Sequence, residues 1–432
     1  MIIKNTTILN FKDLSVKKDV DVLIEENRIK KIGKGLNGEG EVIDGSKFYL
    51  TPGVTNCHAH VAMTLLRGSA EDTTTFDWFN KHIWIYEKNL TPEGVYIGTL
   101  LGVAEMLLSG VTLVCDHYFY MDKAYKAYKE SGIRADLAWA VFGTGEGWEE
   151  KFKEAMNFTE KYSGLDERLT ISLGPHSPYI CPEEFLKRIA EISESTGLKS
   201  HIHVSEEQWE IDKSLKEKGR TPIEYLKDIG ILKKGTILAH AYFATDSDLD
   251  LIKNVGAYIS HAPKTYMRFG VVKDLLPRAI KKGIKVSFAS DGPASNSNIN
   301  IFEVARDAAL LAKISTGNPE TGRVEELIPL LSTGGEFIGR EDIGEVKEGF
   351  VADLLLIKKD SPNMNPDTNI FANILYSLSD RDIDTVIVDG KIVVKNGKLL
   401  TIDVDEVVRE ANRIRDKMIV KRDERPMQTF GV

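Results

Sequence analysis

Two histidine pairs in this sequence have the spacing of metal ligands on β-strands. His58 and His60 end the run GVTNCHAH, and His201 and His203 repeat the spacing in the run LKSHIHVS. Residues two apart on a strand point to the same side of a sheet, so each pair can present two imidazoles to one place. Imidazoles together with a carboxylate, such as that of Asp291 in ASDGPAS, suit a divalent ion such as Zn²⁺ or Fe²⁺. These residue types favour a metal site if the fold gathers them.

The elements that could gather these residues are eight short apolar runs in the middle of the chain. The runs alternate with longer amphipathic stretches between Gly53 and about Arg340. Eight strands that alternate with helices predict an α/β fold, a parallel (β/α)8 TIM-type barrel, in which functional residues stand at the carboxyl ends of the strands. The predicted strands are residues 53–60, 110–119, 132–142, 168–178, 197–206, 235–243, 256–263 and 283–293.

Polar residues gather at the carboxyl ends of these predicted strands. Eight of the nine histidines lie there: His58, His60, His117, His176, His201, His203, His240 and His261. Histidines with unrelated roles in the core or on the surface would not concentrate at one end of eight strands. The pattern therefore indicates a single functional site along the rim that these strand ends form. Taken singly, His240 could equally be a core histidine, His176 a turn residue, and Glu206 a solvated acid at a helix start.

The composition excludes several classes of partner. The chain has 432 residues, a formal net charge of -9 and no Lys/Arg-rich block, so a nucleic-acid partner is not expected. No run approaches about 18 consecutive apolar residues, so we expect no membrane span, and the first residues resemble a strand more than a secretion signal. Three cysteines, an odd and sparse set, fit a reducing compartment. We therefore expect a cytoplasmic protein that acts on a small molecule.

Short strand patterns also occupy both ends of the chain. Near the C-terminus, the run DTVIVDGKIVVKNG holds two apolar segments joined by Asp389-Gly390, which is a strong hairpin signal. A charged helix is expected over residues 404–422. The predicted domains are a composite β-sandwich domain of residues 1–52 and 346–432 and a catalytic barrel domain of residues 53–345.

The runs TPGVTNCHAH, HVSE, LAHA and SDGPASN resemble the amidohydrolase superfamily. Within it, the chain is similar to the 5′-methylthioadenosine/S-adenosylhomocysteine deaminases and especially to the archaeal 5′-deoxyadenosine deaminases. The resemblance covers the whole chain, including the composite β-domain. It implies a hydrolase of C–N bonds in cyclic amidines that converts the adenine ring of a 5′-substituted adenosine to the inosine analogue and ammonia. It also implies a homo-oligomer, either a dimer or a tetramer.

The resemblance assigns roles residue by residue. The implied ligands of one divalent ion, Zn²⁺ or alternatively Fe²⁺ or Mn²⁺, are His58, His60, His203 and Asp291. The implied catalytic residues, which flank the attacking water and the ring, are Glu206, His240 and Asp291. The implied substrate contacts are Glu87 to the ribose hydroxyls, His176 to the nucleoside, and Glu206 and Asp291 at the base.

Two departures from the superfamily pattern narrow the expectation. The end of the fourth strand, GPHSPY, lacks the lysine that bridges two metals in other members, so we expect one metal ion. Relatives that accept S-adenosylhomocysteine hold its carboxylate with arginines near the third strand. Arg134 is present here, but residues 141–150 contain three glutamates and no arginine, so a carboxylate tail would meet repulsion. We therefore expect 5′-deoxyadenosine, 5′-methylthioadenosine or adenosine as substrates in preference to S-adenosylhomocysteine.

Two other interpretations remain open at this point. The same metal scaffold could deaminate or hydrolyse another ring, such as guanine, cytosine or a triazine, although Glu87 and His176 favour a ribose and hence a nucleoside. A barrel without activity, kept as an assembly scaffold, would be expected to have lost metal ligands, and every expected ligand is present here.

Overall fold

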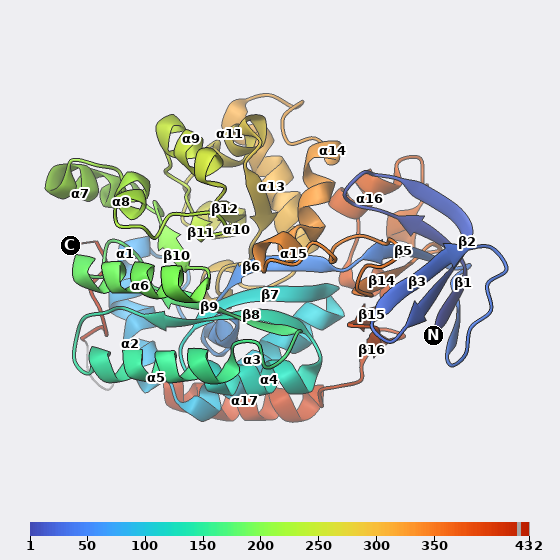
Figure 1. Ribbon diagram of the computed structural model, residues 1–432, viewed down its shortest axis with the longest axis horizontal. Coiled ribbons are helices and arrows are strands. Elements are labelled where there is room, and N and C mark those ends of the chain that lie inside the picture. Colours follow the sequence, from blue (N-terminus) through green and yellow to red (C-terminus); the bar gives the residue numbers. More distant parts are fainter. Residues whose placement is uncertain (421–424, 432) are drawn as a thin grey trace.

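Eight parallel strands occupy the middle of the chain, each within or close to its predicted range. The computed structural model describes residues 1–420 and 425–431 (Figure 1). The strands are β6 (Val54–Ala59), β7 (Val111–Tyr118), β8 (Arg134–Val141), β9 (Leu169–Pro175), β10 (His201–Val204), β11 (Ile237–His240), β12 (Tyr258–His261) and β13 (Lys285–Phe288). They pair in chain order as two four-stranded sheets, β6 to β9 and β10 to β13. Single parallel bridges join the sheets at both edges, Leu173 to Ser200 and Ala59 to Asp291.

Helices alternate with the parallel strands, and further helices follow β13. The helices are α3 (Pro92–Leu108), α4 (Met121–Ser131), α5 (Trp148–Tyr162), α6 (Glu183–Thr196), α7 (Gln208–Lys218), α8 (Pro222–Asp228), α9 (Asp246–Val255), α10 (Pro263–Arg268), α11 (Leu275–Lys282), α12 (Pro293–Asn296), α13 (Ile301–Thr316), α14 (Val324–Leu327), α15 (Gly334–Phe337), α16 (Ile370–Tyr376) and α17 (Val404–Met418). Gly197 and Gly283 end α6 and α11 with φ of 74° and 68°, the left-handed conformation that glycine adopts without strain. Among the described helices, none combines the length and apolar content needed to cross a bilayer.

A run of short helical turns connects β6 to α3 and lies over the carboxyl ends of the strands. These turns are η1 (Val61–Leu66), α1 (Thr75–Asp77), η2 (Trp78–Ile83), α2 (Trp84–Tyr86) and η3 (Glu87–Asn89). The Thr74 side chain accepts a hydrogen bond from the Asp77 backbone and so caps the start of α1. The segment is rich in aromatic residues, and it contributes Trp78, Trp84 and Glu87 to a cavity described below.

Strands from both ends of the chain form one further sheet of nine strands. They are β1 (Ile2–Leu9), β2 (Val16–Glu25), β3 (Arg28–Gly33), β4 (Val42–Asp44), β5 (Phe48–Pro52), β14 (Leu354–Lys358), β15 (Ile383–Val388), β16 (Lys391–Lys395) and β17 (Lys398–Leu399). Antiparallel pairing of β5 with β14 joins the two ends of the chain. Asp389 and Gly390 both have positive φ and close the predicted hairpin between β15 and β16.

The C-terminal helix and one arginine connect the two parts of the fold. Helix α17 packs against α3, and it appears beside α3 and α4 in Figure 1. The last residues of the predicted helix, 421–422, lie outside the described residues. Arg134, the first residue of β8, is buried and pairs with Asp353 at 2.8 Å and Asp389 at 3.1 Å. Arg134 therefore lies at the amino end of its strand, where it binds the terminal sheet.

Candidate active site

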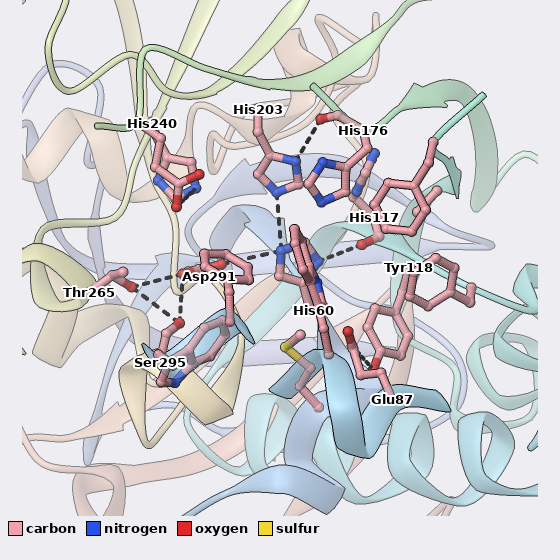
Figure 2. Close-up of a pocket in the computed structure, with 18 of the residues that line it drawn as sticks. His60, Glu87, His117, Tyr118, His176, His203, His240, Thr265, Asp291 and Ser295 are labelled. Carbon is pink, nitrogen blue, oxygen red and sulfur yellow. Dashed lines mark hydrogen bonds and ion pairs between the residues drawn. The ribbon is translucent and has the colours of Figure 1, made fainter. Parts of the chain in front are cut away.

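Three imidazoles and one carboxylate converge at the carboxyl ends of the parallel strands. Nε2 of His60 lies 3.2 Å from Nε2 of His203 and 3.3 Å from Oδ1 of Asp291. Nε2 of His58 lies 3.6 Å from the same Asp291 oxygen. Figure 2 shows His60, His203 and Asp291 pointing toward one another. His58 and His203 come from β6 and β10, and His60 and Asp291 follow β6 and β13, so the structure brings the predicted ligand set together.

Backbone carbonyls orient two of these imidazoles. Nδ1 of His60 lies 2.5 Å from the carbonyl oxygen of His117, and Nδ1 of His203 lies 2.8 Å from that of His176. A carbonyl oxygen only accepts, so Nδ1 carries the proton in both rings and the Nε2 lone pair faces the centre. This is the arrangement by which proteins hold histidine ligands of metals.

The other two members of the group are held by side chains. Nδ1 of His58 lies 2.8 Å from Nε2 of His201, whereas Nε2 of His58 is buried and has no hydrogen-bond partner among the described residues. Oδ2 of Asp291 accepts hydrogen bonds from Thr265 at 3.0 Å and Ser295 at 2.6 Å, which leaves Oδ1 facing the histidines. A buried nitrogen without a partner, beside two more imidazoles and a carboxylate, fits the donor set of one divalent ion.

Burial keeps the imidazoles of His58 and His203 neutral, which is the form that binds a metal. Burial lowers the pKa of His58 to about 4 and those of His176 and His240 to about 3, because it penalises the imidazolium charge. Burial by itself would raise the pKa of Asp291, but the imidazoles that lie close to its carboxylate hold that pKa below its ordinary value. At neutral pH His58 and His203 therefore present neutral nitrogens beside an ionised carboxylate.

A second carboxyl stands beside this group in the opposite protonation state. Glu206 lies just beyond β10, 7% exposed, with Oε1 3.7 Å from Nε2 of His240 and Oε2 accepting a hydrogen bond from Tyr179 at 3.3 Å. Burial, reinforced by the charge of Asp291, raises the pKa of Glu206 well above its ordinary range. Glu206 can therefore hold a proton near neutral pH and donate it to a bound ligand.

Two residues near Glu206 have features that the sequence does not indicate: Glu210 is buried, and His240 has an uncommon backbone conformation. Glu210 fits a solvated helix face by its position, yet it is 2% exposed and its Oε2 accepts a hydrogen bond from the Glu206 backbone at 2.8 Å. Burial raises the pKa of Glu210 to about 8. His240 ends β11 with φ of 75°, an uncommon backbone conformation that fixes where its ring points.

The inner cavity at this place has polar residues at both ends and aromatic walls. His60, His203 and Asp291 lie at one end and Glu87 at the other (Figure 2), and Glu206 lies beside His240 near the possible metal ligands. Glu87 Oε1 accepts a hydrogen bond from the Tyr118 hydroxyl at 2.6 Å, and burial raises the pKa of Glu87 to about 7. The His176 ring lies between those of His203 and Phe142, with centroids 4.6 and 4.7 Å away. Further aromatic side chains of the walls are Trp78, Phe79, Trp84 and Phe269.

A second cavity, here called the outer chamber, continues from the inner one. Glu87, Phe119, Ala140 and Phe142 line both. Further lining side chains of the outer chamber include Trp139, Trp148, Glu146, Glu150, Lys151 and Met427. Arg134 is absent from both linings, because it points into the terminal sheet.

The remaining histidines occupy different depths. His117 lines the inner cavity, and neither of its ring nitrogens has a hydrogen-bond partner in the described part of the chain. His201 is the first residue of β10, so it lies below the rim and contacts His58 from beneath. His261 ends β12 and stacks on Tyr242 outside the inner cavity.

The sequence did not indicate that Tyr118, Thr265 and Ser295 belong to the site. The only sign of their role in the sequence is that each carries a hydroxyl group and lies close to a histidine or aspartate of the predicted strand ends.

Known proteins resemble this chain along nearly its full length. A 5-methylthioadenosine/S-adenosylhomocysteine deaminase of Carboxydothermus hydrogenoformans is 37% identical over 420 residues, covering 96% of this chain and 97% of that protein. A 5′-deoxyadenosine deaminase of Methanobrevibacter smithii is 37% identical over 421 residues, covering 96% and 97%. The crystal structure of an adenosine deaminase from Xanthomonas campestris with bound zinc has the same fold, with a TM-score of 0.92 at 24% identity over 96% of this chain and 98% of that one. The model of the amidohydrolase family matches residues 49–393. This match and the two relatives with more than 30% identity show that the chain belongs to the amidohydrolase family.

Proposed function

We propose that this protein is a metal-dependent aminohydrolase that deaminates the adenine ring of 5′-substituted adenosines. The observation that carries the proposal is one cavity with the possible metal ligands and the protonated Glu206 at one end and Glu87 at the other. An adenosine needs this arrangement, with chemistry at the base and a hydrogen-bond acceptor at the ribose. The deaminase relatives at 37% identity support the same reaction class.

His58, His60, His203 and Asp291 would hold one divalent ion, for which zinc is the first choice and iron or manganese are compatible. Bound there, the ion supplies the Lewis acidity that makes water a competent nucleophile at neutral pH. The zinc bound to the Xanthomonas campestris enzyme supports this choice. No lysine faces the group from the end of β9, which supports a single ion.

The protein's own residues then move the protons. Asp291 accepts the proton of the attacking water, and His240 orients that water toward C6 of the ring. Glu206 gives its proton to N1, so that attack at C6 leaves no negative charge on the ring. A C6–O bond forms, the C6–N bond breaks, and the amine leaves as ammonia with the proton relayed from Asp291. The second proton of the water passes from the new C6 hydroxyl to Glu206, which restores the acid as the C6 carbonyl forms. Water and the adenosine thus become the inosine analogue and ammonia.

Glu87 and His176 would fix the nucleoside with its 5′ carbon toward the outer chamber. The Glu87 carboxyl accepts hydrogen bonds from ribose hydroxyls, and the His176 ring contacts the nucleoside from the side of Phe142. Glu146 and Glu150 line the chamber, and Arg134 does not. A short uncharged 5′ group, as in 5′-deoxyadenosine, 5′-methylthioadenosine or adenosine, therefore fits better than the carboxylate tail of S-adenosylhomocysteine.

We further infer the architecture that frames this site. The two four-stranded sheets, bridged at both edges, form one (β/α)8 barrel domain over residues 53–345. Residues 1–52 and 346–432 form a composite domain, and its sandwich-like curvature is supported by a core cluster drawn entirely from the terminal strands and the segment before β14. Helix α17 belongs to this domain in sequence but packs on α3. We propose a cytoplasmic homo-oligomer, and gel filtration with light scattering tests its size.

Ammonia release from four nucleosides side by side tests the function. The expected order places 5′-deoxyadenosine, 5′-methylthioadenosine and adenosine above S-adenosylhomocysteine. Free adenine serves as the fifth substrate, because it lacks the ribose that Glu87 would bind. Adenine outperforming 5′-deoxyadenosine would remove the ribose assignment, and S-adenosylhomocysteine as the best substrate would refute the argument from the missing arginine.

A further inference from the structure

Residues 425–431, here called the C-terminal strap, lie over the loops at the carboxyl ends of the parallel strands. The strap has no regular secondary structure, so contacts with those loops must fix its position. In Figure 1 the end of the chain lies close to α1 and α6, at the opposite end of the barrel from the terminal sheet. A Cβ placed on Gly431 would come within 3.1 Å of the Phe76 ring in α1, so the strap is in direct contact with this segment.

Phe430 anchors the strap in an aromatic cluster. Its side chain is 2% exposed and stacks on Phe79, with ring centroids 4.3 Å apart and an interplanar angle of 24°. Trp209 and Tyr179 meet the Phe430 ring edge to face at 5.0 and 5.8 Å. The Asn80 side chain donates to the Phe430 carbonyl and accepts from its amide, both at 3.0 Å. One residue thus contributes a buried aromatic ring and two hydrogen bonds.

Two further contacts align the residues before Phe430. The Met427 amide donates to the Trp84 carbonyl at 3.1 Å, and the Gln428 side chain lies 3.5 Å from the Thr144 carbonyl. The strap is therefore bound both to the turns after β6 and to the loop after β8. These are the segments that face each other across the outer chamber.

The strap lines the outer chamber and packs against walls of the inner cavity. Met427 and Gln428 line the outer chamber together with Glu87. Phe430 does not line the inner cavity, but Phe79 and Tyr179, on which it packs, do. A displacement of the strap would therefore open the outer chamber directly and loosen two walls of the inner cavity.

We propose that the C-terminal strap is the specificity element for the 5′ substituent. The strap forms the wall of the chamber that receives this substituent, with the Met427 side chain presenting an apolar surface to it. A chamber closed on this side favours a short uncharged group, and loss of the wall admits a longer polar tail. This inference rests on the proposed deamination of 5′-substituted adenosines.

Two variants test the strap through substrate preference. Met427→Ala removes the side chain at the chamber wall, and Phe430→Ala removes the anchor. The readout is kcat/KM for S-adenosylhomocysteine divided by kcat/KM for 5′-deoxyadenosine, which we expect to rise about tenfold in each variant, the size of effect that pocket contacts give. A purely structural role of the strap would lower both rates together, so an unchanged ratio in both variants would overturn the inference.

Controls separate this outcome from misfolding and from failure of the proposed function. Phe430→Leu keeps an apolar anchor and should give an intermediate ratio, and Ile314→Ala, at an exposed site on α13, should keep the wild-type ratio. If Phe430→Ala does not fold, the test depends on Met427→Ala. The Met427 side chain is only half-buried, so its removal should leave the protein folded. A wild-type chain that deaminates no adenosine overturns the proposed function together with this inference. Wild-type activity combined with an unchanged variant ratio overturns the inference alone.

Discussion

At the residue scale, the site depends on two buried carboxyls in opposite protonation states. Burial and the charge of Asp291 raise the pKa of Glu206, so it keeps a proton to donate. Asp291 is also buried, but the nearby imidazoles lower its pKa, so its carboxylate is ionised and can accept a proton. Pairs of acids whose surroundings push their pKa values apart are the mark of acid–base chemistry. In the proposed mechanism, Glu206 donates one proton and Asp291 accepts the other.

Glu206→Gln should abolish most turnover without disturbing the metal site. Glutamine keeps the size of the side chain but has no acidic proton to give to N1, so kcat should fall by about 10²–10⁴-fold. Metal content, measured by elemental analysis, should stay at the wild-type level. Glu207→Gln is the matched control, because Glu207 is the next residue and lies outside both cavity linings. Turnover near the wild-type rate in Glu206→Gln would exclude Glu206 as the proton donor.

Glu87→Gln should change the pH dependence of stability. Burial raises the folded-state pKa of Glu87 to about 7, above its ordinary value of 4.5, so the folded state binds the proton more tightly than the unfolded state. The contribution of Glu87 to the free energy of unfolding of the wild type is therefore complete below pH 4.5. This contribution falls by roughly 3 kcal/mol as the pH rises toward and through the folded-state pKa. Glutamine cannot ionise, so the variant lacks this loss.

Urea unfolding at pH 5 and pH 8 measures this effect. The free energy of unfolding of Glu87→Gln, relative to wild type, should be higher at pH 8 than at pH 5. The Tyr118 hydroxyl can still donate to the glutamine carbonyl, so the comparison isolates the ionisation. Glu191→Gln, on the exposed side of α6, serves as control. If the variant and the wild type differ in free energy of unfolding by the same amount at both pH values, the pKa of Glu87 is not raised in the folded state.

At the scale of elements, short helices after the strands hold the carboxylate of the proposed metal ligand Asp291 in place. Thr265 in α10 and Ser295 in α12 both donate to Oδ2 of Asp291, which turns Oδ1 toward His58 and His60. Asp291 itself has φ of 57°, a conformation that the surrounding contacts must maintain. The two helices, rather than β13 alone, thus determine where the carboxylate points.

Thr265→Val should weaken metal binding through Asp291. Valine has nearly the same shape but no hydroxyl, and loss of a hydrogen bond behind a ligand typically costs about 10–100-fold in metal affinity. Competition with a chelator measures the affinity. Thr265→Ser restores the hydroxyl and should recover the wild-type value, while Thr385→Val, a buried threonine of the terminal sheet, should leave it unchanged. Equal affinities in Thr265→Val and wild type would mean that Ser295 suffices.

At the scale of the whole molecule, one buried cation joins the parallel strands to the terminal sheet. Arg134 begins β8 and pairs with Asp353 and Asp389, residues more than 200 positions later in the chain. The pair of β5 with β14 brings the chain ends together, and Arg134 connects that sheet to the base of the central strands. This link lies at the end of the strands opposite the site, so it serves stability.

Arg134→Met should destabilise the protein and spare its chemistry. Removing the cation leaves Asp353 buried without its ionic partner, which typically costs about 3–5 kcal/mol. Thermal unfolding should show a lower Tm, while metal content and the order of substrates stay unchanged at low temperature. Arg413→Met breaks exposed ion pairs with Glu93 and Glu410 and should lower the Tm far less than Arg134→Met does. A change in substrate order would place Arg134 in the site after all.

The sequence by itself determined the strands and the chemical types of the site residues. β-branched runs bounded by glycine predicted all eight central strands, because the period of side chains and the turn residues are local properties. The Asp389-Gly390 hairpin was predicted for the same reason, since both residues tolerate positive φ. The two HxH pairs were recognisable as possible ligands from their spacing alone.

Only the tertiary structure decided which of these residues meet and in what state. His60 and His203 are 143 residues apart, and their 3.2 Å separation results from the order of the strands. Depth along a strand separated His201, below the rim, from His203 within it, and burial made Glu210 part of the Glu206 environment. Arg134 and Phe430 gave no local signal, because their roles come from partners far along the chain. Proximity and burial are sums over the whole fold, so no local pattern contains them.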